Sequence, residues 1–387
     1  MPIKKVFHSP IPSIPSTSSK SPVERVDSGE IILKLVGLLC IDMNLFGVSR
    51  REIALVLTLI VISAASFSYG VYVGGKKAPP YETLKVIYES VFGLSSGSRV
   101  EMENVVSAEN YSFEPVENGN FTIGVLPDTQ IYSRSYPKVF DNIVRWIIGH
   151  ESTWNIKFVS QEGDLVQNYS DSTEWKNARG SMRKLDNHIP YGFLAGNHDK
   201  GPSQSADMMN RYFRCSYYEG NWGENWWGGC YWGTKNNYQL ISVPEMDLLF
   251  LHLEYNPSGR VLDWAGRVLD NYPKRFGVIT THSYLGLDGS RTESGERIWN
   301  ELVSRYSNVR LVLCGHVHGE AKSTVVEDNR VINQVLADYQ ARNNGGNGWI
   351  RLLTFNSDEN LIQVRTYSPF LRMFETDKDS QFQLRWN

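Results

Sequence analysis

The sequence predicts an α/β domain with partly parallel sheets over residues 119–375, and two observations support this prediction. From Phe121 onward, short apolar runs alternate with segments of helical periodicity, which is typical of strands joined by crossover helices. After about residue 320, strand-like runs follow one another with no helical segment between them. That second pattern favours antiparallel pairing at the end of the domain.

The individual elements follow from length and periodicity. Short apolar runs predict buried strands, and longer segments with apolar residues three or four apart predict helices. The predicted strands of the first part are Phe121–Leu126, Ile156–Val159, Tyr191–Ala195, Leu248–Leu253, Phe276–Thr280 and Val309–Cys314, and the predicted helices span about residues 136–151, 172–187, 257–271 and 294–306. The later strands are Ser323–Val326, Arg330–Leu336, Trp349–Phe355 and Leu361–Tyr367, with a polar hairpin turn at residues 356–360.

The composition is that of a globular protein. Apolar residues make up 41% and charged residues 21% of the 387 residues, and the formal net charge is −3. A nucleic-acid-binding domain usually carries a strong excess of Lys and Arg, so no nucleic-acid partner is expected. The chain is longer than one compact core needs, which indicates segments outside the domain.

The residues outside the domain divide into four predicted segments. Residues 1–51 are basic, rich in Ser and Pro, and predicted to be disordered. Residues 52–75 are predicted to form a transmembrane helix, residues 76–118 a linker, and residues 376–387 a C-terminal tail. Ile53–Gly75 contains no charged residue, and a helix of that length reaches about 34 Å, enough to cross a hydrocarbon core of about 30 Å.

Other interpretations of Ile53–Gly75 stay open. A buried core helix is disfavoured, because no neighbouring segment would bury it on all sides. A cleaved signal peptide usually has a shorter apolar region of about 7–15 residues, but the small residues at positions 63–66 are compatible with cleavage. Met43 is an alternative start of the chain, which would leave a short basic leader before the span.

The apolar segment predicts a single-pass membrane protein that contacts the membrane through residues 53–75. Basic residues flank the segment on both sides, at Arg50–Arg51 and Lys76–Lys77, so the charge balance does not decide the orientation. An N-terminal span followed by a long soluble domain usually acts as a signal anchor. We therefore expect the large C-terminal domain to lie outside the cytoplasm.

Four cysteines are too few for a disulfide framework or a cysteine zinc site. Cys215 and Cys230 lie in an aromatic segment, Tyr212–Tyr238, and can bridge if the domain is in an oxidising compartment. Two interpretations of this segment stay open. It either lines the mouth of a binding crevice and contacts an organic group of the substrate, or packs as a covering loop over the edge of a sheet.

Residues of the kinds that bind metals follow five of the predicted strands at once. In chain order they are Asp128 and Gln130, Asp164, Asn197 with His198 and Asp199, His282, and His316 with His318. Ligand sites of α/β sheets gather beyond the carboxyl ends of the strands, so five such loops indicate one shared crevice. Each of these short motifs alone is weak evidence for a metal site, since a Gly-Asp pair, for example, is often only a turn.

Glycines adjoin most of these residues. Alternate residues of a straight strand face opposite ways, so His316 and His318 need a bent loop to bind together, and Gly315 and Gly319 are expected to supply the bend. Gly163 and Gly196 are expected to let the backbone approach bound ions closely.

The order Asp-x-Gln, Gly-Asp, Gly-Asn-His-Asp, His and Gly-His-x-His resembles the calcineurin-like metallophosphoesterase superfamily, over Phe121 to about Gly319. The family opens with Asp-x-His, so Gln130 stands where a histidine is usual, and its amide oxygen is a weaker donor than imidazole. The resemblance implies a four-layer αββα sandwich of two mixed sheets with helices outside.

The resemblance also implies a binuclear centre for two divalent ions, which we expect to be Mn, Fe or Zn. Each ion is expected to have four ligands. The expected ligands of the first ion are Asp128, Gln130, Asp164 and His318, and those of the second are Asp164, Asn197, His282 and His316. Asp164 would then bridge both ions, because a carboxylate can bind two cations.

The function implied by the resemblance is hydrolysis of a phosphate ester, by a phosphomonoesterase or a phosphodiesterase, with a metal-bridging hydroxide that attacks phosphorus. His198 is expected to stabilise the phosphate oxygens or to protonate the leaving group. Asp199 is expected to orient the His198 ring, to cap a helix, or to do both. The alternative is a catalytically silent member of the fold that acts as an interaction scaffold at the membrane.

Overall fold

The computed structural model describes residues 105–107, 116–117, 119–221, 226–327 and 329–387. All of them belong to one compact unit, Val100–Asn387. None of the helices within the described ranges has the length and apolar character needed to cross a membrane. The predicted span at residues 53–75 lies outside the described residues, as do the predicted N-terminal segment and most of the linker.

The first sheet has eight strands, in the order β1-β14-β13-β12-β2-β3-β4, with β15 also paired to β13. β2, β3 and β4 run parallel to one another, and β12 joins β2 in the antiparallel sense. The bounds are β1 (Val105–Ser107), β2 (Asn120–Leu126), β3 (Ile156–Gln161), β4 (Tyr191–Gly192), β12 (Ile350–Asn356), β13 (Leu361–Ser368), β14 (Met373–Glu375) and β15 (Gln381–Arg385).

The second sheet has seven strands, in the order β10-β11-β9-β8-β7-β6-β5. β7, β8, β9 and β11 run parallel, and β5, β6 and β10 complete the sheet in the antiparallel sense. The bounds are β5 (Trp227–Cys230), β6 (Asn237–Val243), β7 (Met246–Leu253), β8 (Phe276–Thr281), β9 (Val309–Cys314), β10 (Gly319–Glu327) and β11 (Arg330–Asp338).

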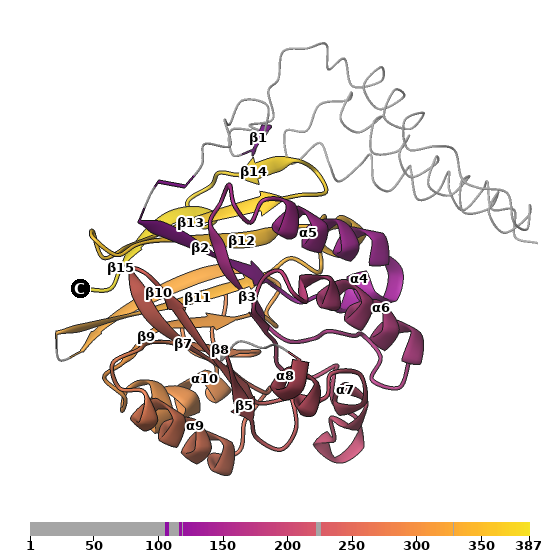
Figure 1. The fold of residues 1–387 in the computed structure, drawn as a ribbon, viewed down its shortest axis with the longest axis horizontal. Coiled ribbons are helices and arrows are strands. Elements are labelled where there is room, and N and C mark those ends of the chain that lie inside the picture. Colours follow the sequence, from indigo (N-terminus) through magenta and orange to yellow (C-terminus); the bar gives the residue numbers. More distant parts are fainter. Residues whose placement is uncertain (1–104, 108–115, 118, 222–225, 328) are drawn as a thin grey trace, which may run out of the picture. The chain divides into compact units, whose positions relative to one another are not determined.

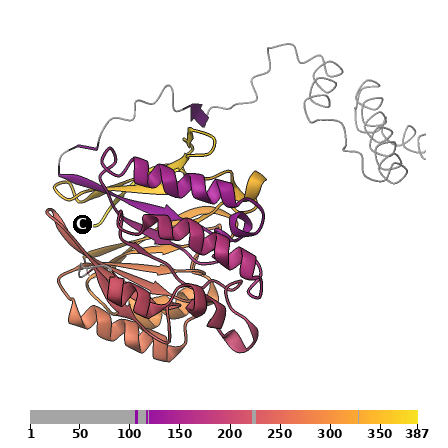
Figure 2. The same cartoon turned by 45° about the vertical axis from the view of Figure 1, so that its right-hand side comes forward.

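Helices cover the outer faces of the two sheets. α4 (Gln130–Ser135), α5 (Pro137–Gly149) and α6 (Ser172–Met182) with the 3-10 turn η2 (Arg183–Leu185) lie on the first sheet, and α9 (Gly259–Asn271), α10 (Glu293–Ile298) and the π-helical turn η4 (Trp299–Val303) lie on the second (Figures 1 and 2). The remaining short helices are η3 (Pro202–Gln204), α7 (Asp207–Tyr212), α8 (Cys215–Asn221) and α11 (Asn343–Gly346). Two mixed sheets with helices outside are therefore confirmed.

The covering helices begin and pack as their sequences dictate. α5 starts with Pro137, whose missing N–H is no loss in the first turn, and buries Phe140, Val144 and Ile147 at helical spacing. α6 starts after Asp171, whose carboxylate accepts hydrogen bonds from two backbone N–H groups of the first turn.

The interface between the sheets becomes more polar toward the carboxyl ends of the parallel strands. Phe158 of β3 stacks on Phe250 of β7 with ring centroids 4.0 Å apart. One inward-facing position further along, Ser160 bonds to His252 at 2.9 Å and to Thr280 at 3.1 Å. All five side chains are buried. This buried polar layer of Ser160, His252 and Thr280 lies between the apolar core and the strand ends.

Two strand predictions differ from the structure for a physical reason. The predicted strand Tyr191–Ala195 pairs only at Tyr191–Gly192, because the carbonyls of Phe193 and Ala195 accept hydrogen bonds from Asn237 and Tyr255 instead. β6 was not predicted, since its inward-facing positions include the fully buried polar residues Asn237 and Gln239. The alternation that marks a strand is weak there.

The C-terminal residues are part of the sheet. β15 runs antiparallel to β13 over Leu361–Arg365, and Trp386 is buried against the core. Residues 376–387, set apart in the sequence as a tail, therefore contribute a strand to the first sheet.

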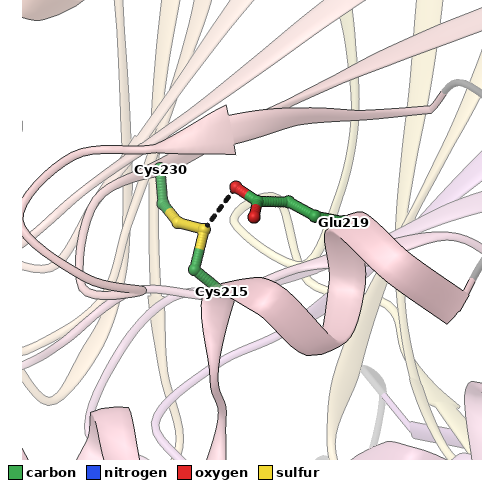
Figure 3. Close-up of side chains that lie close together, drawn as sticks. All are labelled: Cys215, Glu219 and Cys230. Atoms are coloured by element: carbon green, nitrogen blue, oxygen red, sulfur yellow. Dashed lines mark hydrogen bonds between the residues drawn. A yellow bond between two sulfur atoms is a disulfide. The ribbon is translucent and has the colours of Figure 1, made fainter.

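The aromatic segment is tied together by a disulfide between Cys215 and Cys230, whose Cα atoms are 6.4 Å apart (Figure 3). Glu219 Oε1 lies 3.0 Å from the Cys215 sulfur, but disulfide sulfurs do not offer thiolates to a metal. Trp226 is buried, and Trp227 stacks on Tyr218. These side chains pack at the sheet edge, as the covering-loop interpretation expects.

Candidate metal centre

Seven loops converge at the edge formed by the carboxyl ends of the parallel strands. They follow β2, β3 and β4 in the first sheet and β7, β8, β9 and β11 in the second. The predicted site residues follow five of these strands. The loops after β7 and β11 were not predicted to contribute.

The centre of the site is a buried trio of Asp128, Asp164 and His282, whose ligand-type atoms all lie within 4.8 Å of one another. His282 Nε2 is 3.2 Å from Asp164 Oδ2 and 3.9 Å from Asp128 Oδ2. All three residues are at most 2% exposed. The two carboxylates come from the first sheet and the imidazole from the second, so the trio joins the sheets.

The ring of His282 is held in one orientation. Its Nδ1 lies 2.9 Å from the carbonyl oxygen of Glu162, which directs Nε2 toward the carboxylates. Asn197 Oδ1 lies 3.0 Å from the same Nε2. A carbonyl partner on the far nitrogen is the usual way in which a metal-binding histidine is oriented.

Gln130 also reaches the trio, since its Nε2 donates to Asp164 Oδ2 at 2.9 Å. Its Oε1 is buried and has no hydrogen-bond partner. A buried acceptor without a partner costs free energy, and a cation beside the amide would satisfy it.

The two histidines after β9 lie in different places. The backbone N–H of His316 donates to Asp128 Oδ1 at 3.2 Å, and its ring centroid is 4.9 Å from that of His282. The His318 side chain is 57% exposed, and its Nε2 is 3.8 Å from Asp338 Oδ2. The structure thus brings His316 to the trio and leaves His318 at the rim.

The backbone is strained at two of the candidate ligands. Asp164 has a φ of 51° and His316 a φ of 72°, a region that residues other than glycine rarely adopt. His316 therefore makes the bend after β9 itself. Gly315 begins this bend, since its carbonyl oxygen accepts a hydrogen bond from the Val317 N–H at 2.9 Å, and Gly319 has a φ of 135°. Strain of this kind persists where the surrounding structure enforces it, often at functional sites.

Glycines bring the loops into contact with the carboxylates. A Cβ atom at Gly196 would lie 2.0 Å from Asp164 Oδ1, and one at Gly315 would lie 2.1 Å from Asp128 Oδ1. Any side chain at either position would displace a carboxylate of the trio. The close approach expected of Gly196 is therefore an approach to Asp164.

The prediction that Asp199 orients His198 is wrong. The Asp199 carboxylate accepts hydrogen bonds from the backbone N–H groups of Leu165, Val166 and Gly196, all at 2.9 to 3.0 Å. It fastens the loop after β3 to the loop after β4 and caps none of the described helices. Burial and the charge of Asp164 raise the pKa of Asp199 to about 7.

His198 is held by a different residue. Its Nδ1 lies 2.9 Å from the carbonyl oxygen of Gln167 and 3.0 Å from that residue's Nε2. Its backbone N–H donates to Asp164 Oδ1 at 2.9 Å. The ring is therefore tethered through Nδ1 next to the trio.

Three further residues of the site were missed in the sequence. Asp338 and Gln340 follow β11, and Gln340 Nε2 donates to Asp128 Oδ2 at 3.2 Å. Tyr255 follows β7, and its ring lies 5.2 Å from the His316 ring and 5.9 Å from the His282 ring. The signal was available, because polar residues directly after predicted strands had marked the other loops.

The electrostatics of the trio reflect an excess of carboxylates. Burial and the neighbouring Asp338 raise the pKa of Asp128 well above its usual value. Burial alone would lower the pKa of His282, but Asp164 and Asp128 raise it to about 10. Burial and the nearby His282 lower the pKa of His316 to about 4. The site therefore favours a positive charge at the trio and keeps the His316 ring neutral.

These residues fit a metal ion. Carboxylate oxygens, an amide oxygen and imidazole nitrogens together suit divalent transition metals. A cation would offset the repulsion between Asp128 and Asp164 and would satisfy Gln130 Oε1. A second acidic group, Glu320 with Glu375 and Asp377, also has oxygens close together, but arginines pair with two of its members.

Comparison with known proteins decides the family. Residues 121–320, just over half of the chain, match the calcineurin-like phosphoesterase family. The chain belongs to this family. The segment of this phosphoesterase that matches contains every loop of the predicted motif.

One curated protein and two solved structures illustrate what this calcineurin-like phosphoesterase is similar to. It is 35% identical over 281 residues to the uncharacterized protein YvnB of Bacillus subtilis, a match that covers 68% of this chain and 21% of YvnB. The chain thus spans about a fifth of that curated relative. Among solved structures, it is similar to a purple acid phosphatase from yellow lupin, with 12% identity and a TM-score of 0.47 over 70% of this chain and 55% of that chain. It is also similar to a predicted phosphoesterase from Streptococcus pneumoniae, with 11% identity and a TM-score of 0.31 over 69% of this chain and 99% of that chain.

Proposed function

We propose that this protein hydrolyses phosphate esters with a centre of two divalent metal ions. The observation that carries the proposal is the buried trio of Asp128, Asp164 and His282, to which Gln130 presents a buried oxygen without a partner. Buried carboxylates that lie close together, with no Lys or Arg among the described residues paired to them, are expected where a cation binds.

In the proposed centre the first ion would be held by Asp128, Gln130, Asp164 and His318, and the second by Asp164, Asn197, His282 and His316. Mn, Fe or Zn suits this donor set. When bound, two such ions supply Lewis acidity and activate water for attack on phosphorus. His318 is at the rim and must turn inward to take its place.

The remaining residues orient and protect this centre. The Glu162 carbonyl fixes the ring of His282, and Asp199 ties together the loops that carry Asp164 and Asn197. The tether through Nδ1 leaves His198 Nε2 without a protein partner among the described residues. We assign this Nε2 the role of binding a phosphate oxygen or of giving its proton to the leaving group.

The test is hydrolysis of p-nitrophenyl phosphate and bis-p-nitrophenyl phosphate by the full-length chain. The protein is treated with EDTA and then given Mn²⁺, Zn²⁺ or Fe²⁺. The proposal expects negligible turnover after EDTA and recovery with at least one of the metals. The ratio of the two rates separates a phosphomonoesterase from a phosphodiesterase. Absence of turnover with every metal would favour the silent interaction scaffold instead.

We further propose that the phosphoesterase domain lies outside the cytoplasm, anchored through residues 53–75. The disulfide between Cys215 and Cys230 supports an oxidising compartment, where such bonds persist. Protease treatment of intact cells tests the placement, since an outside domain is digested without lysis. Labelling of Cys215 and Cys230 by a thiol reagent before reduction would contradict it.

A further inference from the structure

The segment Asp338–Gln340, at the end of β11, enters the metal centre although the family motif does not include it. β11 runs parallel to β9, so its carboxyl end meets the same crevice as the loop of His316 and His318. Asp338 is 1% exposed, and none of the Lys and Arg side chains that the structure describes pairs with it.

Gln340 is fixed by Asp338 and contacts Asp128. Its backbone N–H donates to Asp338 Oδ1 at 2.9 Å, and its Nε2 donates to Asp338 Oδ2 at 3.0 Å. The same Nε2 donates to Asp128 Oδ2 at 3.2 Å. The amide therefore links the two carboxylates and fixes one oxygen of Asp128, while the backbone of His316 fixes the other.

Asp338 also faces His318. The distance of 3.8 Å between Asp338 Oδ2 and His318 Nε2 exceeds a hydrogen bond but allows attraction between the carboxylate and the ring. A carboxylate beside the far nitrogen commonly sets the orientation of a metal-binding histidine. No other side chain that the structure describes forms a hydrogen bond or ion pair with this ring, so Asp338 is the charged group placed to orient it.

The segment rests on a rigid base. The Tyr339 hydroxyl, fully buried, donates to Glu320 Oε1 at 2.7 Å and accepts from Arg351 Nε at 3.2 Å. Arg351 Nη2 also pairs with Glu320 Oε1 at 2.7 Å. Glu320 lies on β10 of the second sheet and Arg351 on β12 of the first. Asp338 and Gln340 flank Tyr339 in the chain. Because Tyr339 is bonded to a residue of each sheet, both neighbours are held in place.

We propose that Asp338 and Gln340 are positioning residues for the first metal ion. Gln340 holds Asp128 in place, and Asp338 holds Gln340 and orients the ring of His318. The inference rests on the proposed function, because it assigns Asp128 and His318 to that ion. It also accounts for how a site with Gln130 in place of histidine keeps its other ligands in order.

The test compares Asp338→Asn and Gln340→Leu with the matched controls Asp263→Asn, on the exposed face of α9, and Gln383→Leu, on β15. Mn²⁺ binding to the full-length chain is measured by isothermal titration, and thermal unfolding is measured on the EDTA-treated protein. We expect one of two Mn²⁺ to bind about 10–100-fold more weakly in both test variants. The controls should bind as the wild type does.

Thermal unfolding separates positioning from a structural role. The unfolding midpoint of the metal-free test variants should stay within about 3 °C of the wild type. Unchanged Mn²⁺ affinity of the test variants would overturn the inference. So would weaker binding that is accompanied by a large decrease in the unfolding midpoint of the metal-free protein. If the wild type binds Mn²⁺ and hydrolyses esters while the variants bind equally well, this inference fails alone. If the wild type binds no Mn²⁺, the proposed function fails with it.

Discussion

Two groups of charged residues in this domain, one buried and one partly buried, differ in how their charges are balanced. In the metal centre, the imidazole of His282 lies beside both Asp128 and Asp164, and no Lys or Arg that the structure describes forms an ion pair with either carboxylate. In the second group, which we call the sheet-bridging cluster, Glu320 and Glu375 are paired with Arg351 and Arg342. The sheet-bridging cluster is an internal network of Arg–Glu ion pairs, whereas no Lys or Arg among the described residues pairs with the two aspartates of the metal centre. A high density of acids therefore indicates a metal only where Lys and Arg do not pair with them.

The largest effect is expected from Asp164→Asn in the metal centre. The bridging ligand of both proposed ions is weakened, so metal binding and hydrolysis should fall together, the rate by about a thousand-fold or about 4 kcal/mol of transition-state stabilisation. Metal content and the rate with p-nitrophenyl phosphate measure the two effects. Retention of wild-type rates would refute the ligand assignment.

The sheet-bridging cluster should respond through stability. Arg351 is 1% exposed, so Arg351→Met removes the nearest cationic partner of Glu320, leaving Arg342 at 3.5 Å, and should lower the free energy of unfolding by about 3 kcal/mol. The double variant Arg351→Met with Glu320→Gln should recover part of the loss. Urea unfolding gives both values. Equal stability of the single and double variants would show that the pair is not coupled.

Gly196→Ala tests how closely the loops enclose the trio. The added Cβ would lie 2.0 Å from Asp164 Oδ1, so we expect metal affinity to fall about 10–100-fold, as when the support of a ligand is lost. Gly149→Ala at the end of α5 is the matched control, because a Cβ there meets nothing within 4 Å. Titration with Mn²⁺ measures the difference between the two variants. Equal affinities would mean that the loop around Gly196 moves to accommodate the added Cβ.

The smallest expected effect is a change in stability with pH. It concerns the buried polar layer beneath the metal centre, and this layer carries no charge. Burial lowers the pKa of His252 to about 3, whereas an unfolded histidine titrates near 6.5. Below pH 6.5, His252 is protonated in the unfolded chain but stays neutral in the folded chain. The free energy of unfolding therefore falls as the pH falls toward 3. Between pH 7 and pH 5.5 the loss should be about 1 kcal/mol. His252→Gln should remove that part of the pH dependence, and identical slopes would show that His252 is charged in the fold.

Much of the architecture was predictable because apolar periodicity survives in the sequence. The strands from β2 to β13 that bury apolar faces were predicted near their observed bounds, as were α5, α6 and α9. β6 escaped because Asn237 and Gln239 take inward positions, where they bond to the loop after β4 and to each other. Hydrogen bonds between elements far apart in sequence leave no local pattern.

The candidate site was predictable as a set of loops but not in its internal order. Position after a strand identified the residues, yet the partners of Asp199 and His198 depend on distances between loops. The same limit explains why His318 was grouped with the trio although its ring lies at the rim. Asp338 and Gln340 lie outside the family motif, which ends at about Gly319, although they also follow a predicted strand.

The trio is assembled across the interface between the sheets. Asp128 and Asp164 extend from β2 and β3, and His282 extends from β8. A metal held here would cross-link two layers that otherwise meet mainly through side chains. Metal binding should therefore reduce local opening in both sheets. We expect amide hydrogen exchange to slow in β3 and β8 together when the metal is added.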